Sequence, residues 1–208
     1  MLVDLSVEEF MARLGSGDAT PGGGGAAALA GAAAAGLVTM VARLTTGRPA
    51  FTHIESRVRE IIRQGDYLRE TLLAAVDTDA AAFDRVMAAY ALPRATEQEK
   101  AARKEALQLA LRGATESPLA IARACLSISG MATELAEAGN PQTITDAGTA
   151  ATLAQAALQG AIFQARVNLK SLKDETYTGP IRQEIERLLT EAQHATRRTL
   201  QAVEEKLA

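Results

Sequence analysis

The sequence predicts an all-α fold, and three features lead to that prediction. The chain has 208 residues and is 48% hydrophobic, which is enough for a substantial core. Aromatic residues make up only 3%, and alanine is abundant, a mixture that favours helices over strands. No stretch alternates in hydrophobicity with a period of two over the length of a strand. We therefore expect a single domain over residues 1–208, a bundle of about seven to eight helices.

Helix signals divide the first half of the chain into three segments. Residues 6–9 form a capping box, Ser-Val-Glu-Glu, that begins a short helix. A glycine-rich loop is predicted over 15–25, and it leads into an alanine-rich helix over 26–44. The range 52–90 carries apolar residues at helical spacing, as one long helix or as two, and Pro93 ends this pattern.

The second half shows the same kind of punctuation. Thr96 begins a second capping box, and Ser117-Pro118 and Asn140-Pro141 both look like an N-cap followed by a proline at the first helical position. Residues 147–165 carry no charge, so this helix is expected near the middle of the bundle. Pro180 is expected to open a charged, amphipathic final helix.

Charge and cysteine content narrow the function classes. The net charge of −3 gives no field for a polyanion, so nucleic-acid binding is not expected. The single cysteine, Cys125, cannot form an internal disulfide, and two histidines cannot by themselves make a standard structural zinc site. These observations favour a reducing, cytoplasmic location. The uncharged stretch 22–42 is mostly Ala and Gly and predicts a buried helix, not a membrane span, and the acidic N-terminus does not fit a signal peptide.

The run Thr20–Gly25, one proline and four glycines directly before a helix, is the most unusual motif. Glycines let backbone amides approach a ligand closely, and a helix start favours an anion. The run is neither a phosphate-binding Walker loop nor a dinucleotide fingerprint, because no Gly-Lys-Ser/Thr follows and no strand precedes it. Anion binding and close helix packing remain equal explanations.

Two aspartates lie on apolar helix faces. Asp79 shares its face with Phe83, Val86, Met87 and Tyr90, so its carboxylate should be desolvated and its pKa raised toward a value useful for proton transfer. The alternative is a buried ion pair, for example with Arg43. Asp146 shares a face with small and apolar residues, about two turns into its helix if Asn140 is the cap. A salt bridge or a second cap at Thr143 or Thr145 is the alternative there.

Several short segments follow one another in an order and spacing that together are fairly specific, and they cover most of the chain: Thr20–Gly24, Met40–Thr45, Asp79–Phe83, Ala89–Pro93 with Glu97, Gly139–Pro141, Thr145–Gly148, and Val167–Leu169 with Asp174. In these segments the sequence resembles the formiminotetrahydrofolate cyclodeaminase/methenyltetrahydrofolate cyclohydrolase family. It departs from the family at Gly25, where Ser is common, at Gly47–Phe51, which replaces a more basic run, and at Gln164, often Asn.

The resemblance implies an enzyme that acts on the one-carbon group carried by tetrahydrofolate. The reaction implied first converts 5-formiminotetrahydrofolate to 5,10-methenyltetrahydrofolate with release of ammonia. The alternative is methenyltetrahydrofolate cyclohydrolase activity, which gives 10-formyltetrahydrofolate. A third possibility is a non-catalytic folate-binding or interaction module. Because both reactions need only proton transfer, no metal and no prosthetic group is expected, and a folate derivative is the expected small-molecule partner.

Roles for individual residues follow from the same resemblance. Asp146 or Asp79 would serve as general acid and base. The backbone amides of the glycine run, with Arg43 or Arg48, would hold the glutamate carboxylates of the folate tail, and two asparagines would bond the pterin. The implied substrate-binding residues are Pro21, Gly22, Gly23, Gly24, Arg43, Arg48, Asn140 and Asn168. We further expect a homodimer with its site near the subunit contact, because small-residue helix faces need close partners.

Overall fold

The computed structural model describes residues 1–208, and all of its regular elements are helical, as predicted. The α-helices are α1 (Val7–Leu14), α2 (Gly23–Thr45), α3 (Glu55–Ala91), α4 (Glu97–Ala138), α5 (Ile144–Leu169) and α6 (Glu175–Leu207). Three short 3-10 helices, η1 (Leu2–Asp4), η2 (Pro49–Ile54) and η3 (Pro141–Thr143), complete the fold. The predicted capping boxes at Ser6 and Thr96 are both present.

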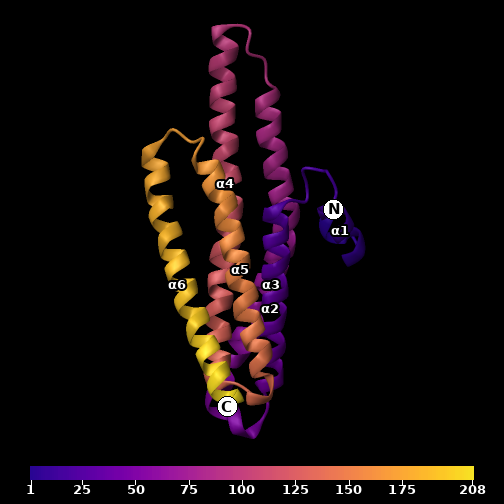
Figure 1. Ribbon diagram of the computed structural model, residues 1–208, viewed down its shortest axis with the longest axis vertical. Helices are drawn as coiled ribbons and strands as arrows, with labels where there is room; N and C mark the ends of the chain where they lie inside the picture. Colours follow the sequence, from indigo (N-terminus) through magenta and orange to yellow (C-terminus); the bar gives the residue numbers. More distant parts are fainter.

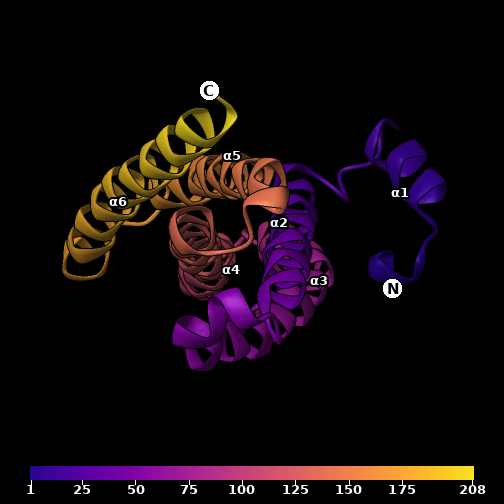
Figure 2. The ribbon, with the colours of Figure 1, turned by 90° about the horizontal axis from the view of Figure 1, so that it is seen from below.

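Five long helices form the bundle, and α1 lies to one side of it (Figures 1 and 2). Seen along the bundle, α4 lies beside α5 and α3, α2 packs between α3 and α5, and α6 covers α4 and α5 (Figure 2). The segment before α1 is tied to α3, because the Leu2 amide donates a hydrogen bond of 2.6 Å to Asp77 Oδ1. The outer sides of α2 and α5 carry exposed residues, Met40 and Phe163 among them.

The six α-helices are fewer than expected because Ser117-Pro118 does not begin a helix. Pro118 lies inside the continuous helix α4, and its missing N–H leaves the Ala114 carbonyl without its helical donor. The side-chain amide of Asn168 on α5 donates to this carbonyl at 2.6 Å. A tertiary contact thus supplies the bond that the local sequence lacks. Pro180 is likewise internal, since α6 begins at Glu175 behind the N-cap Asp174.

Small residues form the centre of the bundle. Ala28, Ala34 and Ala35 on α2 and Ala150 and Ala161 on α5 are each 0% exposed. Alanine stripes let the helix backbones approach one another closely while larger aliphatic residues on the other helices fill the remaining space. By length and composition, α2 and α4 could each cross a membrane, but most of both apolar stretches is buried within the bundle. The prediction of a buried helix at α2 is confirmed.

The hairpin of α3 and α4 extends beyond the other helices at one end of the molecule (Figure 1). There the two helices contact mainly each other, and Arg103 on α4 joins them by donating to the Tyr90 carbonyl at 3.0 Å and lying over the Tyr90 ring. The base of this hairpin, where it meets the start of α2 and the end of α5, contains the candidate site.

Candidate active site

A cavity of about 330 Å³ lies where α3, α4 and α5 meet. One wall is apolar, with Phe83, Val86, Met87 and Tyr90 from α3. The polar groups are Asp79 on the same helix and Gln164 and Asn168 from α5. An apolar pocket with a few convergent polar groups is the usual form of a small-molecule site, and this volume is at the lower end of the range of roughly 300–1,000 Å³. It suits one fused ring system better than a long chain.

The Asp79 carboxylate lies against the first turn of α2. A Cβ atom added to Gly24 would overlap both oxygens of this carboxylate, so only glycine leaves room for it. The amides of the first helical turn have no intrahelical acceptors, and the Gly25 amide is hydrogen-bonded to Asp79. The anion at this helix start is therefore a side chain of the protein itself, and Gly23 and Gly24 belong to α2, not to the predicted loop.

Burial dominates the electrostatics of Asp79. Desolvation raises the pKa of this carboxyl, and the hydrogen bond from the Gly25 amide opposes part of that increase. No ion pair reaches Asp79, and Arg43 pairs instead with Asp66 at 2.6 Å, so the alternative explanation of a buried Asp79–Arg43 pair is wrong. The predicted direction of the shift is confirmed. A carboxyl whose pKa is raised is a stronger base when ionised than an ordinary aspartate, which suits it to general acid–base chemistry.

Two amide side chains of α5 stand beside the aspartate. A Cβ on Gly23 would come within 2.6 Å of Gln164 Nε2, so Gln164 also depends on the glycine start of α2. Asn168 lies one turn further along α5 and is bound through Nδ2 to the Ala114 carbonyl. Helices α2, α3 and α5 thus each contribute to one cluster of Gly23, Gly24, Asp79, Gln164 and Asn168.

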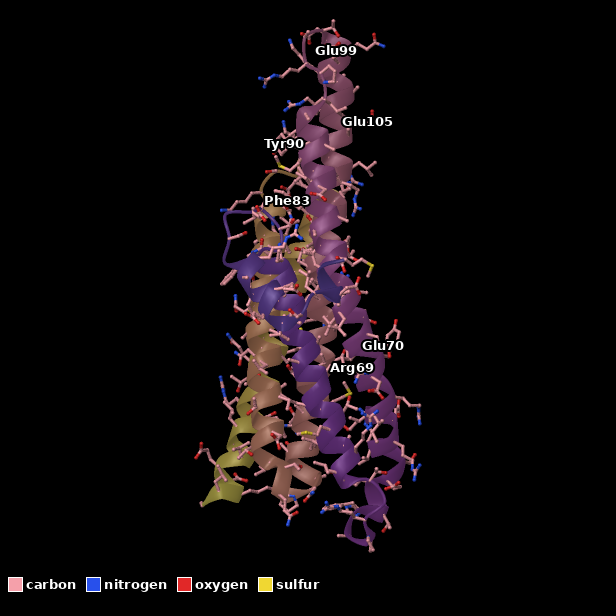
Figure 3. The ribbon with its side chains drawn as sticks, turned by 90° about the vertical axis from the view of Figure 1, so that its right-hand side faces the viewer. Arg69, Glu70, Phe83, Tyr90, Glu99 and Glu105 are labelled. Carbon is pink, nitrogen blue, oxygen red and sulfur yellow. The ribbon has the colours of Figure 1, made fainter.

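The apolar wall is open to solvent. Phe83 is 39% exposed and Tyr90 is 45% exposed, and both lie on α3 above the start of α2 (Figure 3). Val167 of α5, 63% exposed, borders the same cavity. Exposed aromatic side chains beside partly buried polar groups offer a stacking surface for a flat ring.

Four other predicted site residues lie near the C-terminal end of α2: Arg43, Arg48, Asn140 and Asp146. Asp146 is in the first turn of α5, not two turns deep, because η3 separates it from the Asn140 cap. About five helical turns, or about 27 Å, separate Asp146 from Gln164 on the same side of α5. Arg48 is exposed and forms no ion pair, whereas Arg43 is paired with Asp66.

The remaining two predicted residues have structural contacts. Asn140 is buried, and its Oδ1 accepts from the Gln142 amide while its Nδ2 donates to the Leu44 carbonyl, each at 3.1 Å. Both ends of its side chain are therefore used within the chain. Pro21 is buried in the loop that precedes α2, with Gly22 as the N-cap of that helix.

Gln164 is the main site residue that sequence reasoning missed. It was singled out only as a departure from the resembled family, although it lies four residues before Asn168 and therefore on the same face of the helix. The available signal was two side-chain amides four residues apart, at the end of a stretch that carries no charge.

Comparison with known proteins agrees with the fold. The family model for formiminotransferase-cyclodeaminase matches residues 6–205. The chain belongs to this family. The predicted resemblance is thereby confirmed, and the match extends over the whole bundle, including both groups of predicted residues.

Individual relatives carry two different names. Methenyltetrahydrofolate cyclohydrolase of Methylorubrum extorquens is 41% identical over 97% of both chains. Formimidoyltransferase-cyclodeaminase of Rattus norvegicus is 34% identical over 92% of this chain but only 35% of its own length. The crystal structure of formiminotetrahydrofolate cyclodeaminase from Thermotoga maritima superposes with a TM-score of 0.90 over 100% of both chains at 28% identity.

Proposed function

We propose that this protein is a folate one-carbon enzyme that hydrolyses 5,10-methenyltetrahydrofolate to 10-formyltetrahydrofolate. The observation that carries the proposal is the partly buried Asp79 carboxyl, of raised pKa, at the edge of a cavity with exposed aromatic side chains. The relative that matches at 41% identity over 97% of both chains supports the hydrolytic reaction, because it is named for it.

The residues of the cavity suit this chemistry. A water oxygen attacks the methenyl carbon while Asp79 takes one water proton, and Asp79 then passes this proton to N5 as the bond from the methenyl carbon to N5 breaks. The second water proton is released, leaving the formyl group on N10. General acid–base catalysis of this kind contributes about 10²–10⁴-fold. Phe83 and Tyr90 would stack on the ring system, with Gln164 and Asn168 bonding its polar edge.

Ammonia release from 5-formiminotetrahydrofolate is the second candidate. It is supported by the Thermotoga maritima structure, which has a TM-score of 0.90 and carries the cyclodeaminase name. Here N10 attacks the formimino carbon, and the departing nitrogen gains two protons, one from the Asp79 carboxyl and one that N10 loses, so that the bond from carbon to that nitrogen breaks and ammonia leaves. The same carboxyl is used as an acid first in this reaction and as a base first in the hydrolysis.

An absorbance assay of the methenyl chromophore separates the two reactions, because they change it in opposite directions. With 5,10-methenyltetrahydrofolate as substrate, we expect an enzyme-dependent decrease well above the spontaneous rate. With 5-formiminotetrahydrofolate, an increase together with ammonia release would identify the deaminase. Binding of both folates without turnover would leave the third possibility, a non-catalytic module, and would refute the proposal.

We further propose a homodimer formed through the outer face of α2 and α5, called here the α2/α5 face. This face carries no charge. Its exposed apolar members are Ala33, Met40, Leu44, Ala156, Phe163 and Val167, and the exposed Thr145, Thr149 and Thr152 lie on the same side of α5. It measures about 30 Å by about 20 Å, or about 600 Å² per subunit. The total of about 1,200 Å² is at the lower limit of stable interfaces. A second copy of the chain is therefore the occupant that we propose.

An antiparallel dimer would combine the two groups of predicted residues. The exposed alanines Ala33 and Ala156 lie near the middle of the α2/α5 face, where a two-fold axis perpendicular to the helices allows close approach. Such an axis places the Asp146 end of one subunit beside the Asp79 end of the other. It also brings opposite ends of the two α2 dipoles together. The unpaired Arg48 of one subunit then lies toward the acidic Asp79 end of the other.

Mixing two inactive variants tests this arrangement. Asp79→Asn and Asp146→Asn homodimers are unfolded, mixed in equal amounts and refolded, so that about half of the dimers are mixed. If each site combines Asp79 of one subunit with Asp146 of the other, one site per mixed dimer is intact and about a quarter of wild-type activity returns. If both residues act within one chain, no activity returns. Light scattering at micromolar concentration measures the dimer directly.

We propose a reducing, cytoplasmic location. The only cysteine, Cys125, is 0% exposed. Burial raises its thiol pKa to about 12, which leaves almost no reactive thiolate at neutral pH. The proposed reaction uses proton transfer alone, with the folate as substrate and not as a bound prosthetic group.

A further inference from the structure

Asn168 forms a hydrogen bond with the backbone of α4 that the proposed chemistry does not explain. In a regular helix the N–H of residue 118 would donate to the carbonyl of residue 114, but proline has no N–H. The carbonyl of Ala114 instead accepts from Asn168 Nδ2 at 2.6 Å. Ala114 and Asn168 both line the cavity.

This contact fixes the direction of the amide. A backbone carbonyl can only accept, so the NH₂ group of Asn168 must face Ala114 and the Oδ1 atom must point elsewhere. Oδ1 has no hydrogen-bond partner within the chain, although the side chain is partly buried. Asn168 therefore offers the cavity an acceptor, its Oδ1 atom. Without the bond to Ala114, the amide could rotate and offer its NH₂ group as a donor instead.

We infer that Pro118 is a positioning residue that keeps the Ala114 carbonyl available for Asn168, and that Asn168 Oδ1 thereby selects a substrate ring with an N–H donor at its edge. The inference rests on the proposed function for its ligand, because the amino and ring N–H groups of a pterin are such donors. A ring with only acceptors at that edge would face Oδ1 without a bond and would be disfavoured.

The test is Pro118→Ala, with Pro180→Ala as the matched control. Alanine at 118 supplies the missing N–H, which then competes with Asn168 for the Ala114 carbonyl and releases the amide. We expect KM to rise about 3- to 10-fold, the factor that one neutral hydrogen bond contributes, with kcat within about twofold of wild type. Pro180 is also internal to a helix but is exposed, and no side chain bonds the Thr176 carbonyl, so Pro180→Ala should leave KM unchanged.

Asn168→Ala provides the background that separates positioning from packing. If Pro118 acts through Asn168, Pro118→Ala should raise KM in the wild type and have no further effect on KM in the Asn168→Ala protein. Equal effects of Pro118→Ala in both backgrounds, or an unchanged KM in the single variant, would overturn the inference. Pro118→Ala should not lower the melting temperature in either background, because alanine is a better helix residue than proline.

A second readout does not depend on folate. In the wild type the Asn168 side-chain amide, assigned by its absence in Asn168→Ala, should give ¹⁵N-resolved NMR signals with slow hydrogen exchange. Pro118→Ala should accelerate that exchange, and unchanged exchange would contradict the positioning role. If exchange accelerates but the wild type neither binds nor converts a folate, the proposed function fails while the restraint on Asn168 stands.

Discussion

The two aspartates that the sequence singled out lie near opposite ends of α2, Asp79 on α3 and Asp146 on α5. The structure gives them different surroundings. Asp79 lies across the start of a different helix, and burial raises its pKa. Asp146 occupies the first turn of its own helix and does not line the cavity around Asp79, although both aspartates are partly buried. A carboxylate in the first turn of its own helix is a common stabilising arrangement. Position on an apolar stripe therefore does not by itself identify a catalytic group, whereas contact with another helix start does so more strongly.

Replacing Asp79 should have the largest effect. Asp79→Asn keeps the size of the side chain but removes its proton chemistry, so kcat should fall by about 10²–10⁴-fold. Circular dichroism should show an unchanged helical fold. Wild-type turnover in this variant would remove the Asp79 end from the mechanism.

Asp146→Asn sharpens the comparison from the other end. In the proposed antiparallel dimer, turnover should fall on the order of 10²-fold, because Asp146 then reaches the partner's cavity. If its role is limited to its own helix, the variant should instead lose only stability, by about 0.3–1 kcal/mol in the free energy of unfolding. Turnover measured beside thermal melting distinguishes these outcomes.

The glycine start of α2 provides a third and smaller test. Gly24→Ala adds a Cβ that overlaps the Asp79 carboxylate, so the side chain must move and kcat should fall about tenfold or more. Gly130→Ala in α4 is the control, since a Cβ there meets no atom within 4 Å. It should stabilise the protein by about 0.5–1 kcal/mol and leave kcat unchanged. Equal kcat values in the two variants would show that the position of Asp79 is unimportant.

The pH dependence of stability should show the smallest effect. The pKa of Asp79 is higher in the folded than in the unfolded protein, so the folded state binds more protons between these two values. The contribution of Asp79 to the free energy of unfolding therefore decreases as the pH rises through that interval. Melting curves of wild type and Asp79→Asn should diverge there, the wild type losing relatively more stability with rising pH. Parallel curves would contradict the raised pKa.

Local signals predicted the helices well and the site only in part. The capping boxes at Ser6 and Thr96 and the face shared by Asp79 and Tyr90 depend on residues close in sequence, and each was predicted. Ser117-Pro118 has the same local pattern as a helix start, but α4 continues through it, and the distant Asn168 bonds the carbonyl that Pro118 leaves free. No local pattern contains that information.

The glycine run illustrates the same limit. Its composition predicts a loop, yet Gly23 and Gly24 begin helix α2. These positions require glycine because side chains from α5 and α3 occupy the space where Cβ atoms would be. The reason for glycine lies in residues 79 and 164, and becomes visible only when the three helices are brought together. The expected depth of Asp146 was wrong for a similar reason, because the separate turn of η3 was not foreseen.

The projecting α3–α4 hairpin has a consequence for the dynamics of the cavity. Its outer turns are held mainly by each other, so they should open by local fluctuation far more often than the bundle unfolds, and their amides should exchange with solvent first. Tyr90 belongs to this hairpin, whereas Val167 belongs to the firmly packed body, and both border the cavity. A bound molecule that touches both would restrain the hairpin and lose part of its affinity to the entropy of ordering it. Affinity at this site is therefore tuned by the stiffness of a distant tip as well as by the groups that touch the ligand.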